Sequence, residues 1–268
     1  MKRMVRLSSL LLVPLCLLLP GDRPAKPVHT PWLVRLPASA DHHGPWAPRM
    51  RRASGRTMNW AGYVVETNLV TPEKKSVTDV QGSWRVPSVS ASDTNTYSAI
   101  WVGLDGSSNR TVEQIGTEQD WSSGGPVYYA WFEMYPQRGY QIMDFPVSPG
   151  DRISAEVQWI SKTSFNLMIT NLTQSVGFSI VRKRSAQRTS AEWIVEAPYF
   201  RRVLSLADFG AATFTACSVT VTGVTGAVDN ASWQNESVTM ETAKSVVTAQ
   251  PGGLTSGGTS FTVTWEHQ

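Results

Sequence analysis

From Asn59 onward, hydrophobic and polar residues alternate with a period of two over many short segments, separated by clusters of Gly, Pro, Asn, Asp and Ser. This alternation is typical of β-strands, and no segment has the spacing of a long amphipathic helix. The pattern predicts strands at 60–66, 79–86, 97–105, 111–116, 126–135, 152–160, 164–171, 176–182, 191–197, 213–223, 235–241 and 258–266. Because helical crossovers are missing from this pattern, the strands are expected to form two large antiparallel sheets packed as a sandwich.

The alternation also divides each strand between two faces. Three strands carry an apolar row that we assign to the core: Tyr128, Ala130, Phe132 and Met134 in the first, Ile100, Val102 and Leu104 in the second, and Ala191, Trp193 and Val195 in the third. Their opposite rows mix aromatic side chains with acids: Val127, Tyr129, Trp131, Glu133 and Tyr135, then Trp101, Gly103 and Asp105, then Glu192, Ile194 and Glu196. Aromatic and acidic side chains on one shared face are typical of a binding groove.

The chain of 268 residues has four histidines, at positions 29, 42, 43 and 267. Residues 44–266 therefore lack the imidazole that a Ser-His-Asp triad, a Cys-His dyad or a His-ligated zinc site requires. Catalysis within the body would have to use carboxylates, amides, hydroxyls or tyrosine. We expect no metal and no organic cofactor.

The amino terminus has the pattern of a secretory signal. Residues 1–20 hold three basic residues followed by a Leu-rich run that is too short to span a membrane. We expect a secreted protein without stable membrane insertion. Cys16 lies in this signal, so Cys217 would be the one cysteine of the mature chain, and no intramolecular disulfide could form. We expect Cys217 to be a buried apolar residue.

Residues 21–57 form a basic, proline-rich segment with six Pro and with seven Lys or Arg against two Asp, whereas residues 58–268 hold 14 Lys or Arg and 19 Asp or Glu. A basic arm on an acidic body suggests a pro-segment that covers an acidic surface and inhibits the domain at 58–268. A solvated linker, or an arm that binds an anionic surface, is the alternative. The Arg49–Arg56 cluster is a candidate processing site.

Several motifs occur in an order that resembles the glutamic peptidases, or eqolisins. They are Asn59-Trp60-Ala61-Gly62-Tyr63, Trp101-Val102-Gly103-Leu104-Asp105-Gly106, Gln114-Ile115-Gly116, Tyr129-Ala130-Trp131-Phe132-Glu133-Met134-Tyr135-Pro136 and Ala191-Glu192-Trp193-Ile194-Val195-Glu196. The resemblance implies a concanavalin-like or lectin-like β-sandwich and a secreted acid endopeptidase insensitive to pepstatin. It also implies that Gln114 and Glu196 are the catalytic pair, and that Trp101, Asp105, Trp131 and Glu133 contact the substrate.

In such an enzyme Glu196 would activate a water molecule, and the amide of Gln114 would stabilise the oxyanion. The substrates would be polypeptides, nucleic acid would not be a partner, and we expect a monomer. From the residues alone, Asp105 before Gly106 could equally be a turn former. Glu113, Glu118 and Glu192 are expected to be solvated, although Glu192 shares a strand face with Glu196. Asn59 and Tyr63 are expected to be structural.

Two departures from the fungal members stand out. Gly116 is followed by Thr117-Glu118-Gln119 before Asp120-Trp121, which predicts a longer loop beside Gln114. The missing disulfides suggest a bacterial-type member.

Two other functions fit the same pattern. A β-sandwich glycoside hydrolase could use Glu133 and Glu196 as its carboxylate pair, with tryptophans stacked on the sugar rings. A non-catalytic carbohydrate-binding module could use the aromatic face alone.

Overall fold

A computed structural model describes residues 33–36, 51–255 and 257–267. The described residues form twenty β-strands and no α-helix, so the all-β prediction is confirmed. None of the described segments makes an apolar helix of membrane-spanning length. The signal predicted at 1–20 lies outside the described residues, as do residues 21–32 and 37–50 of the predicted pro-segment.

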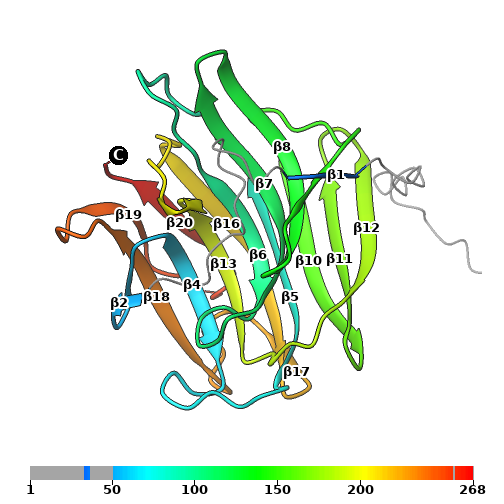
Figure 1. Ribbon diagram of the computed structural model, residues 1–268. Coiled ribbons are helices and arrows are strands. Elements are labelled where there is room, and N and C mark those ends of the chain that lie inside the picture. The colour runs from blue at the N-terminus through cyan, green and yellow to red at the C-terminus, as the bar shows by residue number, and fades with distance from the viewer. Residues whose placement is uncertain (1–32, 37–50, 256, 268) are drawn as a thin grey trace, which may run out of the picture.

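Most strands belong to two curved sheets, one in front of the other in Figure 1. The front sheet consists, in order, of β1 (Leu33–Arg35), β9 (Tyr140–Ile142), β8 (Gly125–Tyr135), β7 (Val112–Ser122), β6 (Ala99–Leu104), β13 (Ser190–Glu196), β4 (Trp60–Glu66) and β18 (Gln234–Glu241). The back sheet consists of β12 (Val176–Lys183), β11 (Ser164–Asn171), β10 (Arg152–Ser161), β5 (Val77–Arg85), β16 (Ala211–Val221), β20 (Phe261–Trp265), β19 (Val247–Pro251) and again β18. All of these pairings are antiparallel, as predicted.

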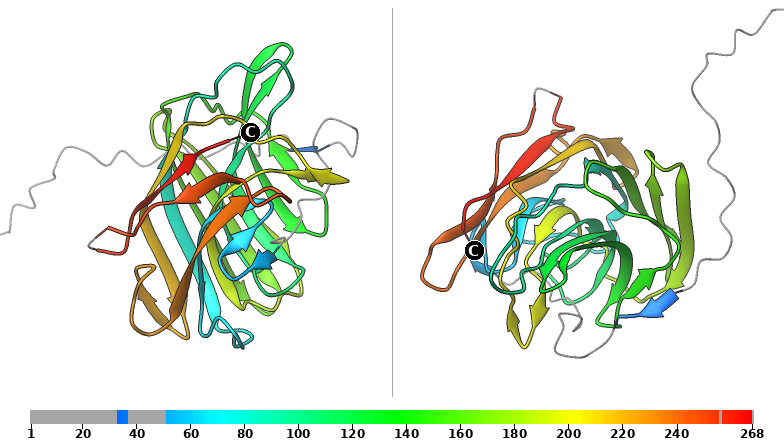
Figure 2. Two further views of the ribbon diagram at one scale, coloured as in Figure 1. Left: turned by 90° about the vertical axis from the view of Figure 1, so that its left-hand side faces the viewer. Right: turned by 90° about the horizontal axis from the view of Figure 1, so that it is seen from above.

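Five short strands complete the fold. They are β2 (Arg51–Ala53), β3 (Arg56–Thr57), β17 (Val224–Gly226), and the hairpin of β14 (Tyr199–Phe200) and β15 (Arg202–Val203). The view from above in Figure 2 shows the two sheets curving towards each other. They are joined along one side, because β18 pairs with β4 at its beginning and with β19 at its end.

The main hydrophobic core fills the space between the sheets. Side chains from the front sheet, such as Val102 and Phe132, belong to the same buried cluster as Trp84, Ile153 and Phe214 of the back sheet. The rows assigned to the core from the period-two pattern all lie on this side, Tyr128 at its margin. The predicted division of faces is therefore confirmed for the strands from which it was drawn.

The other face of the front sheet carries a second apolar cluster, which we call the groove cluster. Its buried members are Leu36, Trp60, Val64, Ala99, Trp101, Val112, Tyr129, Trp131, Ile194 and Val238. Leu36 is the member that comes from the predicted pro-segment. The backbone N–H of Leu36 donates to the carbonyl of Gly139 at 3.0 Å, directly after β1 has paired with β9.

The prediction of a longer loop beside Gln114 is wrong. Strand β7 continues without interruption from Val112 to Ser122, and its pairing with β8 is regular down to the partners Ser122 and Gly125. The predicted strand 111–116 was too short because Glu118 and Asp120 look like surface residues in the sequence. Both are buried in the structure.

Candidate active site

Gln114 and Glu196 lie on the same face of the front sheet. In an antiparallel sheet, residues paired across strands point to the same side. Glu196 pairs with Ala99 on β6, Gln114 pairs with Gly103 on β6, and Ala99 and Gly103 are four residues apart. This is also the face of the groove cluster, since Ala99 belongs to it.

Glu196 is surrounded by hydrogen-bond donors. The indole N–H of Trp101 donates to its Oε2 at 2.9 Å, and the amide of Asn59 donates to its Oε1 at 3.2 Å. Burial raises the pKa of Glu196 well above its usual range, while Trp60, Trp101 and Asn59 oppose this rise. Donors aimed at a carboxylate favour its ionised form, so this site is built to hold a negative charge once water reaches it.

Trp101 connects the two candidate catalytic residues. While its indole nitrogen contacts Glu196, the far edge of its ring lies over Gly103. A Cβ atom on Gly103 would come within 2.9 Å of Cζ3 of Trp101 and 3.2 Å of Cβ of Gln114. Glycine at position 103 thus lets one indole ring reach from Glu196 to the neighbourhood of Gln114.

The amide of Gln114 is oriented by Glu133. Its Nε2 donates to Oε2 of Glu133 at 2.9 Å, and the two residues are direct partners between β7 and β8. Gln114 is 1% exposed and Glu133 is fully buried. The bond fixes which end of the amide carries the N–H groups, so Glu133 positions Gln114 in this state.

Glu192 and Glu196 differ in their electrostatic surroundings. Glu192 shares a row with Gln114, because both pair with Gly103. Burial raises the pKa of Glu192 well above its usual range, and the acids Asp105, Glu66 and Glu113 raise it further against one favourable bond from Ser190. Its environment favours the neutral form, so Glu196 is the better candidate for a base.

Trp131 lies in the row next to these residues. It pairs with Gly116, which pairs on its other side with Trp101. Both tryptophans are fully buried in the groove cluster, and the ring of Trp60 meets that of Trp101 edge to face at 5.0 Å. The aromatic face predicted from the sequence is therefore a continuous layer.

Asp105 has contacts of a different kind. Its carboxylate accepts hydrogen bonds from the backbone N–H groups of Arg188 and Thr189 at 2.7 and 2.8 Å. Further donors are the side chains of Asn109, Thr111 and Thr189. These contacts tie the turn after β6 to the segment that enters β13. We therefore revise its expected groove role to a structural one, which was the alternative from its sequence context.

The sequence interpretation missed two residues near Glu196. Asn59, expected to be structural, donates directly to Glu196. Glu118, expected to be solvated, is fully buried, and so are Glu113 and Glu192. For Glu118 and Glu192 the expectation was wrong because period-two alternation does not distinguish a covered groove from a solvent-facing sheet. Glu113 lies on the other face of β7, in the row of Leu104 and Met134 that belongs to the main core. The position of Asn59 directly before the Trp60 strand was the one available signal.

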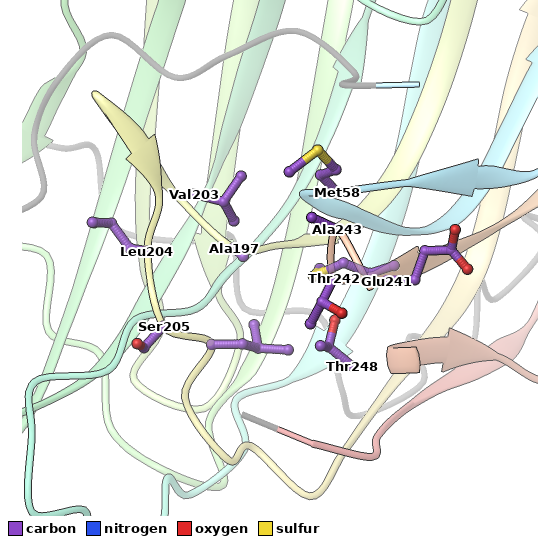
Figure 3. A pocket seen from close by; sticks show the side chains of 11 residues that line it. Met58, Ala197, Val203, Leu204, Ser205, Glu241, Thr242, Ala243 and Thr248 are labelled. Atoms are coloured by element: carbon purple, nitrogen blue, oxygen red, sulfur yellow. The ribbon is translucent and has the colours of Figure 1, made fainter. Parts of the chain in front are cut away.

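A cavity of about 240 Å³ opens near the end of β13 (Figure 3). Its lining includes Met58, Ala197, Val203, Leu204, Leu206 and Met240. None of the candidate catalytic side chains lines it, although Ala197 follows Glu196 and Met58 precedes Asn59 in the chain. In the described part of the molecule no group of three His, Cys, Asp or Glu side chains is arranged to hold a metal ion.

A model of the Peptidase A4 family matches residues 58–265 of the chain. The chain belongs to this family. The match covers the whole body predicted at 58–268 except its last three residues. The resemblance to glutamic peptidases drawn from the motifs is thereby confirmed.

Individual members of the Peptidase A4 family agree with this assignment. Aspergillopepsin-2 from Aspergillus niger is 32% identical over 194 residues, which are 62% of this chain and 66% of that protein. The chain thus spans about two thirds of the length of this curated relative.

Solved structures show the same fold. Scytalido-glutamic peptidase, in a crystal structure with a transition state analog inhibitor, has a TM-score of 0.65 and 24% identity, over 78% of this chain and 98% of that chain. Aspergilloglutamic peptidase from Aspergillus niger has a TM-score of 0.55 and 30% identity, over 64% of this chain and 99% of that chain. The sandwich predicted from the sequence is thus the fold of these glutamic peptidases.

Proposed function

We propose that the protein is a secreted acid endopeptidase that hydrolyses peptide bonds with Glu196 as base and Gln114 as oxyanion donor. The observation that carries the proposal is that both side chains lie on one face of one sheet, connected by the indole of Trp101. Membership of the Peptidase A4 family supports peptide hydrolysis as the reaction.

In this mechanism the ionised Glu196 takes a proton from a water molecule as the water oxygen adds to the scissile carbonyl. Glu196 then gives this proton to the amine nitrogen as the C–N bond breaks. The donors Trp101 and Asn59 hold the carboxylate in place and favour the charged form that a base needs.

Gln114 serves the developing oxyanion. Its amide carries two N–H groups that do not titrate, so it can donate at any pH. In the present state one of them is bonded to Glu133, which leaves the second for the substrate. Removal of one such donor in comparable enzymes costs about 3 kcal/mol of transition-state stabilisation.

Polypeptide substrates would lie along the aromatic layer. Trp101 and Trp131 offer flat surfaces for side chains, and Glu133 in its neutral form can donate to a substrate carbonyl at acidic pH. No metal or cofactor takes part in the proposed steps, and we keep the monomer as the expected state.

The basic segment before the domain is proposed as its inhibitor. Strand β1 adds to the edge of the front sheet at β9, and the Leu36 side chain packs in the groove cluster with Trp101 and Trp131. In this proposal such an occupant contributes to the burial that raises the pKa of Glu196. Removal of the segment after export would allow Glu196 to ionise.

The competing functions make different demands on Gln114. A glycoside hydrolase using Glu133 and Glu196 would need Gln114 only as a neighbour of Glu133, and a carbohydrate-binding module would need neither acid. No observation favours either over the peptidase.

The decisive experiment is the pH dependence of peptide hydrolysis by the acid-matured protein, with pepstatin present, for the wild type, Gln114→Ala and Glu196→Gln. We expect an acidic optimum and a loss of kcat of about 100-fold or more in each variant. Gln119→Ala and Glu192→Gln are matched controls: Gln119 lies on the same strand as Gln114 but bonds to Thr117, and Glu192 lies on the same strand as Glu196. Equal losses in variants and controls, or a neutral optimum, would contradict the proposal.

A further inference from the structure

Glu118 is a buried acid on the groove face that the proposed mechanism leaves without a role. It pairs with Ala99 on β6, which on its other side pairs with Glu196 on β13. Because neighbouring strands are about 4.8 Å apart, the Cα atoms of Glu118 and Glu196 are about 10 Å apart across the sheet. Ala99, the residue between them, carries only a methyl group. The two glutamate side chains, both fully buried, therefore face one compartment.

The two carboxyl groups have opposite surroundings. Glu196 receives N–H donors from Trp101 and Asn59. At Glu118 neither oxygen accepts a hydrogen bond from an N–H donor in the described part of the chain. When two interacting acids have environments of this kind, the first proton leaves the site that has the N–H donors, and the other site retains its proton.

The groups that face Glu118 are acids or phenols. Asp120 follows on the same strand, Tyr129 is its partner on β8, and Glu196 approaches from β13. Tyr97, before β6, interacts with Tyr129. Burial, then Asp120 and Glu196, raise the pKa of Glu118 well above its usual range. Every charged neighbour of Glu118 that we identify thus favours its neutral form.

Glu118 also lies on the strand that carries the proposed oxyanion donor. Gln114 and Glu118 are on the same face of β7, each two residues from Gly116, and Trp101 occupies the space over Gly116, where an added Cβ atom would come within 2.6 Å of Cβ of Trp101. An ionised Glu118 would add a negative charge to the face on which Gln114 has to stabilise another. A neutral Glu118 would not.

We propose that Glu118 is a positioning residue that acts through Glu196. Its carboxyl group must stay protonated, so that Glu196 alone carries the negative charge of a base. The proposal rests on the proposed peptidase function. In this proposal the fall of activity at low pH, the acid limb of the profile, is due to protonation of Glu196. The fall at high pH, the alkaline limb, is due to ionisation of Glu118.

The test is the pH dependence of kcat/KM for the acid-matured wild type, Glu118→Gln and the control Glu192→Gln. Glutamine keeps the shape of a neutral glutamate and has no proton to lose. We expect Glu118→Gln to keep kcat at its optimum within about threefold of the wild type, and its alkaline limb to move up by about one pH unit or more. Its acid limb should stay in place, because Glu118 is already neutral in the pH range where Glu196 ionises. Glu192→Gln should leave both limbs in place.

Three results would overturn the proposal. A Glu118→Gln profile that superimposes on that of the wild type means that Glu118 does not set the alkaline limb. A folded Glu118→Gln variant that is inactive at every pH means that Glu118 itself exchanges a proton with the substrate. If Glu118→Gln does not fold, Glu118→Asp is measured instead. Asp keeps a carboxyl group that can ionise, so activity that no longer falls at high pH in this variant counts against the proposal. An inactive wild type would refute the peptidase function itself, whereas an active wild type with an unchanged variant refutes the role of Glu118 alone.

Discussion

Trp101 donates its indole N–H to Oε2 of Glu196 at 2.9 Å, from the neighbouring strand of the same sheet. A hydrogen bond to a charged group contributes about 1.5–3 kcal/mol. We expect Trp101→Phe to lower kcat/KM about 10- to 100-fold and to move the acid limb of the profile to higher pH, because the ionised form of Glu196 loses a donor. Kinetics across the acidic range measure both effects. Trp131→Phe removes an indole from the adjacent row, so an equal shift of its acid limb would count against the role given to Trp101.

The bond between Gln114 and Glu133 predicts strongly non-additive kinetics. Glu133→Ala should lower kcat about 10-fold by releasing the amide of Gln114, and Gln114→Ala should lower it about 100-fold or more. The kcat of the double variant should be no lower than that of Gln114→Ala, because Glu133 has no amide left to orient and the loss of its own contact with the substrate carbonyl is expected in KM. Additive losses in this double-mutant cycle would show that Glu133 acts independently, as the paired acid of a glycoside hydrolase would.

Leu36 predicts how the precursor is held inactive. Leu36→Asp in the full chain should uncover the groove, because an ionised side chain is disfavoured in the apolar groove cluster. We expect uncleaved Leu36→Asp precursor to hydrolyse peptide at least about 10-fold faster than the uncleaved wild type. Val34→Asp is the control, since Val34 in β1 is 48% exposed. Equal activation of the two variants would show that disturbance of β1, rather than loss of the Leu36 contact, opens the groove.

Buried acids predict that the fold is most stable in acid. Burial raises the pKa values of Glu113, Glu118, Glu192 and Glu196 well above the usual range. Such a group contributes fully to stability below its unfolded pKa of about 4.3, and the contribution is lost as the pH rises towards its folded pKa. Within that window each group costs up to about 1.4 kcal/mol per pH unit.

Thermal unfolding between pH 3 and pH 8 measures this dependence, and Tm should fall as the pH rises. Glu113→Gln should raise Tm at pH 7 but leave it unchanged at pH 3.5, because Glu113 points into the core and is not assigned to the reaction. A Tm that is flat across this range, or a Glu113→Gln variant stabilised equally at both pH values, would contradict the prediction.

Asp105 predicts a stability defect without a kinetic one. Asp105→Ala leaves the buried N–H groups of Arg188 and Thr189 without their acceptor, which should cost about 2–4 kcal/mol of unfolding free energy. The kcat/KM of the folded fraction should stay within about threefold of the wild type. Urea denaturation and kinetics on the same sample separate the two effects. A stable but inactive variant would restore Asp105 to the substrate-binding residues.

The sequence predicted the strands that carry the candidate site and the faces of those strands. Trp101, Trp131 and Glu133 were assigned to the non-core side by alternation, and they lie there with Gln114 and Glu196. The assignment of faces succeeds because successive side chains of a strand point to opposite sides. Once the apolar row is assigned to the core, the remaining residues must lie on the opposite face.

Other features depended on contacts distant in the chain and escaped the pattern. The short strands β9 and β19 have too few residues to show alternation, and β9 is defined by its pairing with β8 and β1. Glu118 and Glu192 looked solvated because nothing local shows that their face is covered. Asn59 precedes its strand, and its contact with Glu196 joins residues 137 positions apart.

Strand β18 passes from one sheet to the other within a few residues. Val238 pairs with Gly62 and packs in the groove cluster, whereas Met240 pairs with Ala249 and packs in the main core. A slip of one residue would withdraw both side chains from their separate apolar sites at once. Two separate apolar clusters therefore fix the pairing register of this one strand. A shifted register that suited one cluster would remove a buried side chain from the other.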